Sequence, residues 1–146
     1  MQPLPHLYTV SLSAGTTGCG EVTSPGLPPL CLNAPADFDG PGDEWSTEHL
    51  LLTAVQGCFL LTFRAVAAAW QVPFTGLTAE TAGTVDRKDG VTRFTEIALK
   101  PTVTFPAGTN MERATRLVEK AEKNCLISAS LSVPVRLETV LLEAVA

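Results

Sequence analysis

One long apolar stretch constrains this chain more than any other feature: residues 46–70, STEHLLLTAVQGCFLLTFRAVAAAW. A helix of this length spans roughly 37 Å at about 1.5 Å per residue. Its apolar residues occupy almost every face, and such a helix is buried either in a protein core or in a bilayer. Ser46 fits an N-cap, and Glu48 in the first turn suits the positive end of the helix dipole. We therefore expect the central helix of a small enzyme, with Cys58 as its working thiol.

Two other interpretations of this helix stay open. Its length also fits a transmembrane span. Against that, Arg64 lies inside the run, Gln56 and Gly57 lie near its middle, and amphipathic segments on both sides need a soluble core. Buried cysteines are mostly inert small hydrophobes, so simple packing is the alternative role for Cys58.

Composition narrows the class of protein. The 146 residues predict one domain, residues 1–146, which should bury roughly 68–70% of its unfolded surface. The net charge is −5, and the first 63 residues contain no Lys or Arg, which argues against binding nucleic acid or an acidic membrane surface. The opening MQPLPHLYTV lacks the charged and apolar regions of a secretory signal, so we expect a cytoplasmic protein. The four cysteines show no zinc-ligand spacing, and we expect no metal.

The elements on either side of the helix predict an α+β fold with antiparallel sheet, because strands occur in blocks and do not alternate strictly with helices. Alternation or turn residues predict strands at 7–13, 21–24, 30–33, 77–86, 91–105 and 133–143, with a hairpin turn at 88–90. A second helix is expected at 110–124, capped by Asn110, and its apolar stripe consists of Met111, Ala114, Leu117, Val118 and Ala121. Pro101 should bend its strand or place it at an edge. The polar loop 34–44 is either a lid over a site or a plain linker.

Two motifs resemble the OsmC/Ohr family, the osmotically inducible and organic hydroperoxide resistance proteins. The first is Ser46-Thr47-Glu48-His49-Leu50, with Gly57-Cys58-Phe59 following ten residues after Glu48. The second is Ala121-Glu122-Lys123-Asn124-Cys125-Leu126-Ile127-Ser128, which is similar to the Cys-Pro-Ile-Ser segment of that family. The order of elements matches over nearly the whole chain. The resemblance implies an OsmC-like fold in which antiparallel sheets surround a long buried helix, assembled as an intertwined homodimer.

The same resemblance implies an activity and a set of site residues. It implies a thiol peroxidase for organic hydroperoxides, an antioxidant of the oxidative stress response, in which Cys58 is the peroxidatic cysteine, Cys125 the resolving cysteine and Glu48 an orienting carboxylate. It implies no bound cofactor, since electrons come from external dithiols, in some members from lipoylated proteins. We further expect Thr17, Trp45, His49 and Phe59 around a substrate pocket.

The chain departs from the family pattern at one position that matters. The peroxidases carry an arginine in the N-terminal strand region, where this chain has Thr17. Leu126 also replaces a proline. Without the arginine, the cation beside the thiolate is His49, a partner subunit's Arg64 or nothing at all. An alternative function therefore stays open: an OsmC-like dimer that binds a small apolar or electrophilic ligand and has little or no peroxidase activity.

The chemistry supports two further expectations. Peroxide reduction needs a thiolate, and the sulfenic acid it forms needs a second thiol nearby to condense with. Glu48 lies ten residues before Cys58, about 15 Å along a helix and about 80° around it. Glu48 can therefore approach Cys58 only if the helix breaks or if the contact comes from another subunit.

Cys19 and Cys31 have no family role, so structural burial is expected for both, with an extra redox thiol at Cys19 as the alternative.

Overall fold

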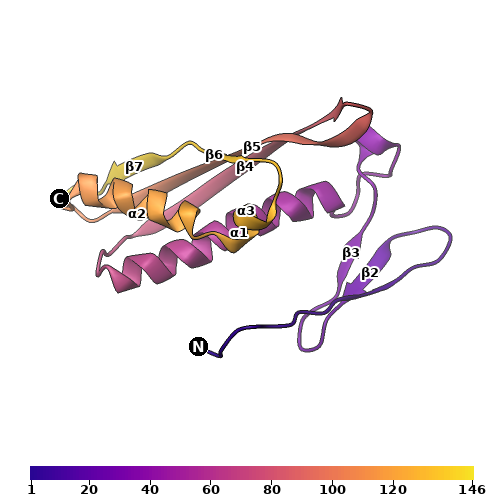
Figure 1. Cartoon of the computed structure of the whole chain (residues 1–146), viewed down its shortest axis with the longest axis horizontal. Helices are drawn as coiled ribbons and strands as arrows, with labels where there is room; N and C mark the ends of the chain where they lie inside the picture. Colours follow the sequence, from indigo (N-terminus) through magenta and orange to yellow (C-terminus); the bar gives the residue numbers. More distant parts are fainter. The chain divides into compact units, whose positions relative to one another are not determined.

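The computed structural model describes residues 1–146 (Figure 1). The chain divides into two compact units, Met1–Leu50 and Leu51–Ala146, and each is described by itself. The long helix α1 (Thr47–Ala69) begins at the end of the first unit and continues through the second. The single domain expected from the sequence stays a prediction.

The first unit is a small antiparallel sheet with the strand order β1-β2-β3. Its strands are β1 (Ser11–Ser13), β2 (Gly20–Thr23) and β3 (Leu30–Leu32), and a single 3₁₀ turn, η1 (Ala36–Phe38), follows in the polar loop. The strand expected at 7–13 is correct only for its last three residues, because β2 offers partners for those three alone. No apolar residue of this unit is buried, so its sheet has no core of its own.

A disulfide between Cys19 and Cys31 joins neighbouring strands of this sheet. Their Cα atoms lie 5.7 Å apart, within the usual range for a disulfide. Cys31 is directly opposite Glu21, and residues two apart on a strand share a face, so the bond lies on the face of Glu21 and Thr23. Leu12, Val22 and Leu30 lie on the opposite face. The structural burial expected for the two cysteines is therefore wrong: they are partly exposed and bonded to each other.

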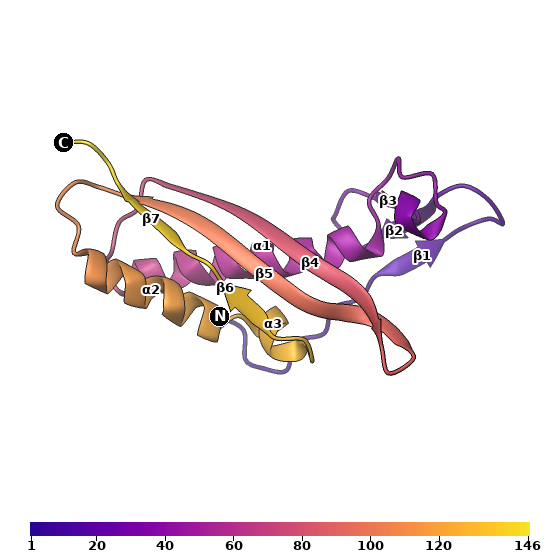
Figure 2. The same cartoon turned by 90° about the horizontal axis from the view of Figure 1, so that it is seen from above.

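The second unit is one layer of sheet with helices on one face (Figure 2). β4 (Gly76–Lys88) and β5 (Val91–Phe105) form a long antiparallel hairpin with one irregularity between Thr84 and Val85. The hairpin turn is the expected Asp-Gly pair, and Asp89 (φ 52°) and Gly90 (φ 77°) both take the left-handed conformation that such a turn requires. Helices α2 (Met111–Lys123) and α3 (Leu126–Ser130) then lead to the last strands.

Pro101 explains where the structure differs from the expected final strand 133–143. That segment forms two strands, β6 (Val135–Leu137) and β7 (Val140–Glu143), and both pair with β5 in parallel rather than antiparallel fashion. Their partners on β5 are residues 97–99 and 102–105, so the interruption falls at Lys100 and Pro101. Proline has no N–H to donate to a ladder. The sheet is therefore mixed, and β5 is its central strand and not an edge.

The core of the second unit lies between this sheet and the helices. Asn110 caps α2, as expected, by accepting a hydrogen bond from the Arg113 N–H at 3.0 Å. The expected stripe of α2 is buried except for Met111, which is partly buried, and α1 contributes a stripe with a spacing of four residues. The buried residues of this cluster are Phe59, Phe63, Ala67, Val72, Leu99, Val103, Phe105, Ala114, Leu117, Val118 and Ala121.

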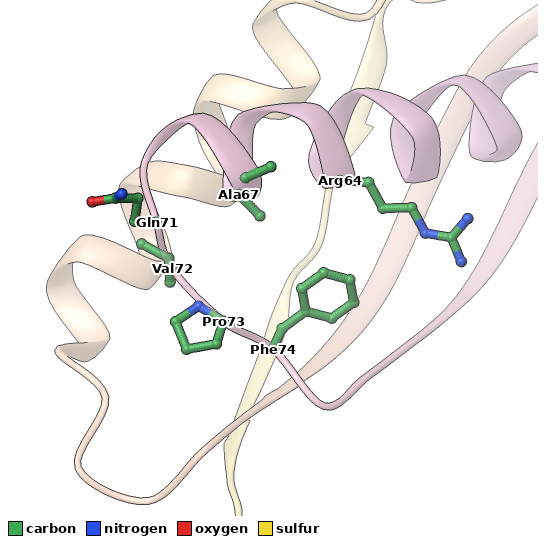
Figure 3. Close-up of a pocket in the computed structure, with 7 residues that line it drawn as sticks. Arg64, Ala67, Gln71, Val72, Pro73 and Phe74 are labelled. Carbon is green, nitrogen blue, oxygen red and sulfur yellow. The ribbon is translucent and has the colours of Figure 1, made fainter.

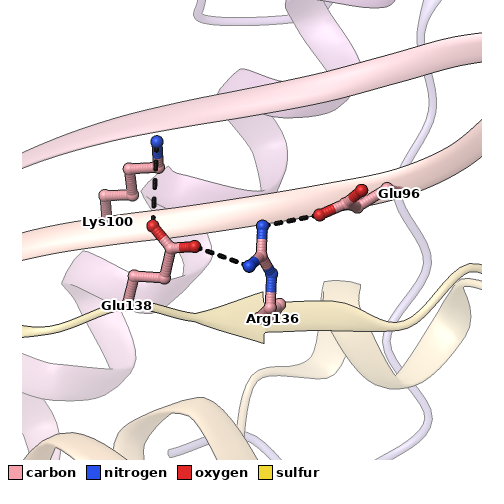
Figure 4. Close-up of polar contacts among 4 residues, drawn as sticks. All are labelled: Glu96, Lys100, Arg136 and Glu138. Atoms are coloured by element: carbon pink, nitrogen blue, oxygen red, sulfur yellow. Dashed lines mark hydrogen bonds and ion pairs between the residues drawn. The ribbon is translucent and has the colours of Figure 1, made fainter.

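Four charged side chains line the outer face of the sheet (Figure 4). Arg136 donates to Glu96 at 2.6 Å and pairs with Glu138 at 2.8 Å, and Lys100 lies 3.7 Å from Glu138. Glu96 and Lys100 alternate with the buried Ile97 and Leu99, which places the charges on the side away from the helices. All four side chains are partly exposed, so each pair contributes less than about 1 kcal/mol.

Helix α1 is long and apolar enough to cross a membrane by length and composition. Its fully buried residues form a single stripe, Val55, Phe59, Phe63 and Ala67, which packs in the cores of the second unit. Other faces of the helix are also apolar, and Leu61 is 64% exposed. The sequence-based expectation of a helix buried on all sides therefore holds for one stripe only.

Candidate active site

Helix α1 positions the first thiol of the site. Cys58 precedes the buried Phe59, so it lies at the margin of the stripe that faces the core and is only partly buried. Thr62 lies one helical turn further on, on the same face, and its Oγ1 is 3.9 Å from the Cys58 Sγ. The thiol thus has a hydroxyl neighbour within its own helix and stays partly open to solvent.

The second thiol lies at the junction between α2 and α3. Cys125 is the N-cap of α3, its N–H donates to the Glu122 carbonyl at 3.0 Å, and its residue is 1% exposed. At the start of a helix the first N–H groups have no partner inside the helix. Here the free N–H groups of Leu126 and Ile127 reach the Cys58 sulfur. Both cysteines are reduced.

These contacts lower the pKa of the Cys58 thiol below that of a free cysteine. Burial by itself raises this pKa, but four hydrogen bonds to the sulfur outweigh it: from the Ile127 N–H, the Cys125 thiol, the Thr62 hydroxyl and the Leu126 N–H. Hydrogen bonds to an anion favour the ionised form. Cys58 is therefore the thiol of the pair that is ready to act as a nucleophile.

The same contacts raise the pKa of the Cys125 thiol. Burial is the largest cause, and the neighbouring Cys58 adds to it because a thiolate there disfavours a second negative charge. Ser128 lowers this pKa through its hydroxyl and its backbone N–H, without reversing the direction. The site therefore holds one activated sulfur and one protonated sulfur in hydrogen-bonding contact, an arrangement suited to attack followed by disulfide formation.

No cation acts on either thiol. The groups that shift the pKa of Cys58 and Cys125 are backbone N–H groups, hydroxyls and the two sulfurs themselves. Arg64 instead lines a separate open hollow of about 480 Å³, where α1 ends and the chain turns toward β4 (Figure 3). Ala67, Val72 and Phe74 also line it, and it contains no cysteine. Within this chain the backbone N–H groups of Leu126 and Ile127, at the start of α3, contribute to lowering the pKa of Cys58.

Glu48 is placed in the first turn of α1, and Ser46 caps that turn. The Ser46 hydroxyl accepts from the His49 N–H at 3.2 Å, which confirms the expected N-cap. The Oε2 atom of Glu48 is buried and has no hydrogen-bond partner. Helix α1 is unbroken from Thr47 to Ala69, so the expected alternative of a helix break between Glu48 and Cys58 is wrong. The separation of about 15 Å along the axis therefore stands.

The structure supports only part of the expected substrate pocket. Trp45 and His49 line one hollow of about 330 Å³ together with Gly42, Asp43 and Glu44, and their rings meet edge to face with centroids 6.4 Å apart. Thr17 is exposed in the loop between β1 and β2 and does not line this hollow.

The expectation for Phe59 as a pocket residue is wrong. This side chain is fully buried and packs in the core, with its ring centroid 5.9 Å from that of Phe63. Phe59 and Phe63 are four residues apart, one helical turn, so they share the inward face. A side chain that lines a pocket would have to lie on a face of α1 that does not pack in the core.

Several groups of the site were not predicted from the sequence. The amides of Leu126 and Ile127 act through the backbone, so no residue type marks them. Thr62 could have been found, because it lies four residues after Cys58 on an expected helix. Among the residues of the structure, no group of three or more His, Cys, Asp or Glu side chains is arranged to hold a metal ion.

Fold and site together define an α+β protein with a paired-thiol centre between a long helix and a helix junction. The family of OsmC-like proteins matches residues 40–140, and the chain belongs to this family. An uncharacterized protein of Bacillus subtilis (strain 168), YmaD, is 27% identical over 110 residues, 73% of each chain.

Solved structures share the fold. An OsmC-like protein of unknown function from Vibrio cholerae superposes with a TM-score of 0.85 at 17% identity, covering 93% of this chain and 100% of that one. An organic hydroperoxide resistance protein from Elizabethkingia anophelis superposes with a TM-score of 0.75 at 20% identity, covering 97% and 100%. A protein described as organic hydroperoxide resistance protein OsmC, from Legionella pneumophila, gives 0.71 at 23% identity, covering 94% and 99%.

Proposed function

We propose that this protein is a thiol peroxidase that reduces organic hydroperoxides through Cys58 and Cys125. The observation that carries the proposal is the pairing of two free thiols, a partly exposed Cys58 on α1 and a buried Cys125 at the junction of α2 and α3, and the direction of the two pKa shifts agrees with it. A lowered pKa supplies the nucleophilic thiolate, and a neighbouring neutral thiol can resolve the product. The organic hydroperoxide resistance proteins among the structural neighbours support the choice of substrate class.

The reaction balances without a bound cofactor. The Cys58 thiolate attacks one oxygen of the hydroperoxide, the O–O bond breaks, and the alkoxide leaves and takes up a proton as the alcohol. Cys58 is then a sulfenic acid. The Cys125 sulfur attacks the Cys58 sulfur, an S–S bond forms, and the hydroxyl leaves as water once protonated. An external dithiol, such as a lipoyl group on a partner protein, reduces this disulfide, and the cytoplasm is the compartment in which we place the cycle.

The proposal includes a homodimer. Glu48 cannot approach the Cys58 of its own unbroken helix, and its buried carboxylate oxygen has no partner within the chain. Buried unpaired oxygens are uncommon in folded proteins. Helix α1 also keeps Leu61 and other apolar residues outside its buried stripe. A second copy that covers this surface and brings its Glu48 to the site accounts for both features.

A binding function is the second candidate, and the lack of any cation at the thiols favours it. An OsmC-like dimer without an activating arginine could hold a small apolar or electrophilic ligand and turn over peroxide slowly or not at all. The hollow at Trp45 and His49 has an aromatic wall suited to such a ligand.

One experiment separates the two candidates. The reduced protein is mixed with one equivalent of cumene hydroperoxide, or of hydrogen peroxide, and the cysteines are mapped by mass spectrometry over time. We expect a rapid Cys58–Cys125 disulfide that forms faster with the organic peroxide. The variant C58S should form none, while C125S should stop at a sulfenic acid that a dimedone probe traps. If Cys58 stays reduced for many minutes in the folded protein, the peroxidase proposal fails and ligand screening of the dimer follows.

A further inference from the structure

A second group of polar side chains surrounds the resolving thiol and has no part in the reaction described so far. Glu122 lies in the last turn of α2, Cys125 caps α3, and Ser128 lies within α3. Backbone hydrogen bonds of 3.0 Å run from the Cys125 N–H to the Glu122 carbonyl and from the Ala129 N–H to the Cys125 carbonyl, and Ser128 lies within the turn that the second bond closes. All three side chains therefore belong to one short, well-fixed junction.

Two atoms of this junction, Glu122 Oε2 and Ser128 Oγ, are buried and make no hydrogen bond of ordinary geometry, although the Ser128 hydroxyl is near enough to Glu122 and Cys125 to affect the pKa of each. A buried polar atom left unpaired costs about 1–3 kcal/mol. Such groups are rare in folded proteins, and a catalytic role is one of the accepted explanations. Two of them therefore lie in the same short junction as the buried Cys125 thiol, and each has hydrogen-bonding capacity that is unused in the resting structure.

The Ser128 hydroxyl affects the pKa of both Glu122 and Cys125. Burial raises the pKa of the Glu122 carboxyl, and the Ser128 hydroxyl partly offsets this effect. The same hydroxyl partly offsets the burial that raises the pKa of Cys125. From α1, the titratable group that faces this cluster is Cys58. No Lys, Arg, His or Asp side chain contributes to the pKa shifts of Cys58, Glu122 or Cys125.

We propose that Glu122 accepts the proton of the Cys125 thiol through the Ser128 hydroxyl when Cys125 attacks the oxidised Cys58. The inference rests on the proposed function, since it concerns the resolving step of that reaction. The Ser128 hydroxyl passes its proton to Glu122 and takes the thiol proton. The Cys125 sulfur then forms the S–S bond as the hydroxyl leaves Cys58. Glu122 finally gives up this proton to the hydroxyl that leaves Cys58, which yields water and restores the carboxylate.

In this scheme Ser128 is a catalytic residue of the resolving step, because its hydroxyl takes the Cys125 proton, and Glu122 acts through Ser128. They solve a specific problem, which is that Cys125 is the sulfur of raised pKa and must nevertheless lose its proton in a site without a cation. A raised pKa of Glu122 suits the task, because a stronger base accepts the proton more readily.

The test isolates the resolving step from the peroxide. The folded protein, with Cys19–Cys31 intact, is treated with Ellman's reagent so that Cys58 carries a thionitrobenzoate. Attack by Cys125 then releases the coloured thiolate, which is followed by stopped-flow absorbance as a function of pH. In the wild type the rate should fall as the pH drops through the raised pKa of Glu122, because the carboxylate is lost.

The isosteric variant E122Q should release the thiolate at least about tenfold more slowly at neutral pH. Its rate should then rise with pH into the alkaline range, following the ionisation of Cys125 alone. S128A should behave like E122Q, and S128T should recover the wild-type profile because it keeps the hydroxyl. The exposed neighbour variant E119Q is the matched control and should leave rate and profile unchanged. Equal rates and profiles for E122Q and the wild type overturn the inference.

Failure of the proposed function gives a different result. If the protein does not react with hydroperoxide, Cys58 stays unoxidised in the mapping experiment whatever residue stands at 122. The thionitrobenzoate release still measures proton transfer from Cys125 in that case. The two proposals can therefore fail separately.

Discussion

The two cysteine pairs of this chain show how surroundings decide what a pair of sulfurs does. Cys31 lies on β3 and Cys19 directly precedes β2, in a sheet that buries no apolar residue, and the two cysteines are joined. Cys58 and Cys125 lie between a core helix and a helix junction, and they are free. The first pair strengthens a unit that has no core. The second pair can stay open because the core around it already holds the unit together.

This comparison also separates two sources of reactivity. The pairing of β2 with β3 brings Cys31 close to Cys19, which directly precedes β2. At the second pair, hydrogen bonds lower one pKa while burial raises the other. Two cysteines that lie close together can form a structural cross-link, whereas a redox site also needs surroundings that shift the two thiol pKa values in opposite directions.

The largest expected effect tests the claim that a core stabilises the second unit. Phe63 is fully buried and its ring meets that of Phe74 edge to face, with centroids 5.0 Å apart. The variant F63A should lower the free energy of unfolding by about 3–5 kcal/mol, measured by urea denaturation. Phe38 is 50% exposed in the first unit, so F38A is the matched control and should change stability by less than about 1 kcal/mol. Equal losses in the two variants would contradict the contrast.

The next effect tests the cross-link of the first unit. Removing the bond with C31S should destabilise the sheet by about 3 kcal/mol, the loop-closure value for a separation of 12 residues. Amide hydrogen exchange of residues 11–32 should then become much faster, while exchange in β5 changes little. The double variant C19S/C31S should cost no more than the single one, because the loop constraint is lost only once. Additive losses would show that the two side chains act independently.

The smallest effect concerns the inequality within the second pair. Iodoacetamide should alkylate Cys58 at a lower pH than Cys125, because the lowered pKa of Cys58 keeps it as a thiolate where Cys125 is neutral. The variant T62V removes one hydrogen bond to the sulfur, worth about 1 kcal/mol, and should slow alkylation of Cys58 about fivefold near neutral pH. T47V, at an exposed threonine in the first turn of the same helix, provides the control. An unchanged pH profile of alkylation in T62V would show that the Thr62 hydroxyl does not lower the pKa of Cys58.

Local patterns were sufficient to predict the elements that depend on neighbours in sequence. The Asp89-Gly90 hairpin, the caps at Ser46 and Asn110 and the buried stripe of α2 all follow from residues within a few positions of one another. The division of the last strand did not, because it depends on Pro101 in the middle of a different strand.

The site divides in the same way. Cys58 and Cys125 could be named as candidates from two short motifs, and the structure brings these two thiols into contact. Periodicity could not identify which face of α1 is buried, since its apolar residues occupy nearly every face, and Phe59 was misplaced for that reason. The amides of Leu126 and Ile127 come to Cys58 from a segment far along the chain, so only tertiary structure reveals them.

The position of Cys125 in the connection between β5 and β6 has a topological consequence. A bond from Cys58 to Cys125 closes a covalent ring that contains β4, β5 and α2, while β6 and β7 remain outside it. Such a ring restricts the unfolded chain and favours the folded one by about 4 kcal/mol. Each oxidation would therefore change the polymer itself, from a nearly linear chain to a large loop with two tails. An oxidised chain would therefore have a smaller hydrodynamic radius than a reduced chain, even after its tertiary structure has been lost.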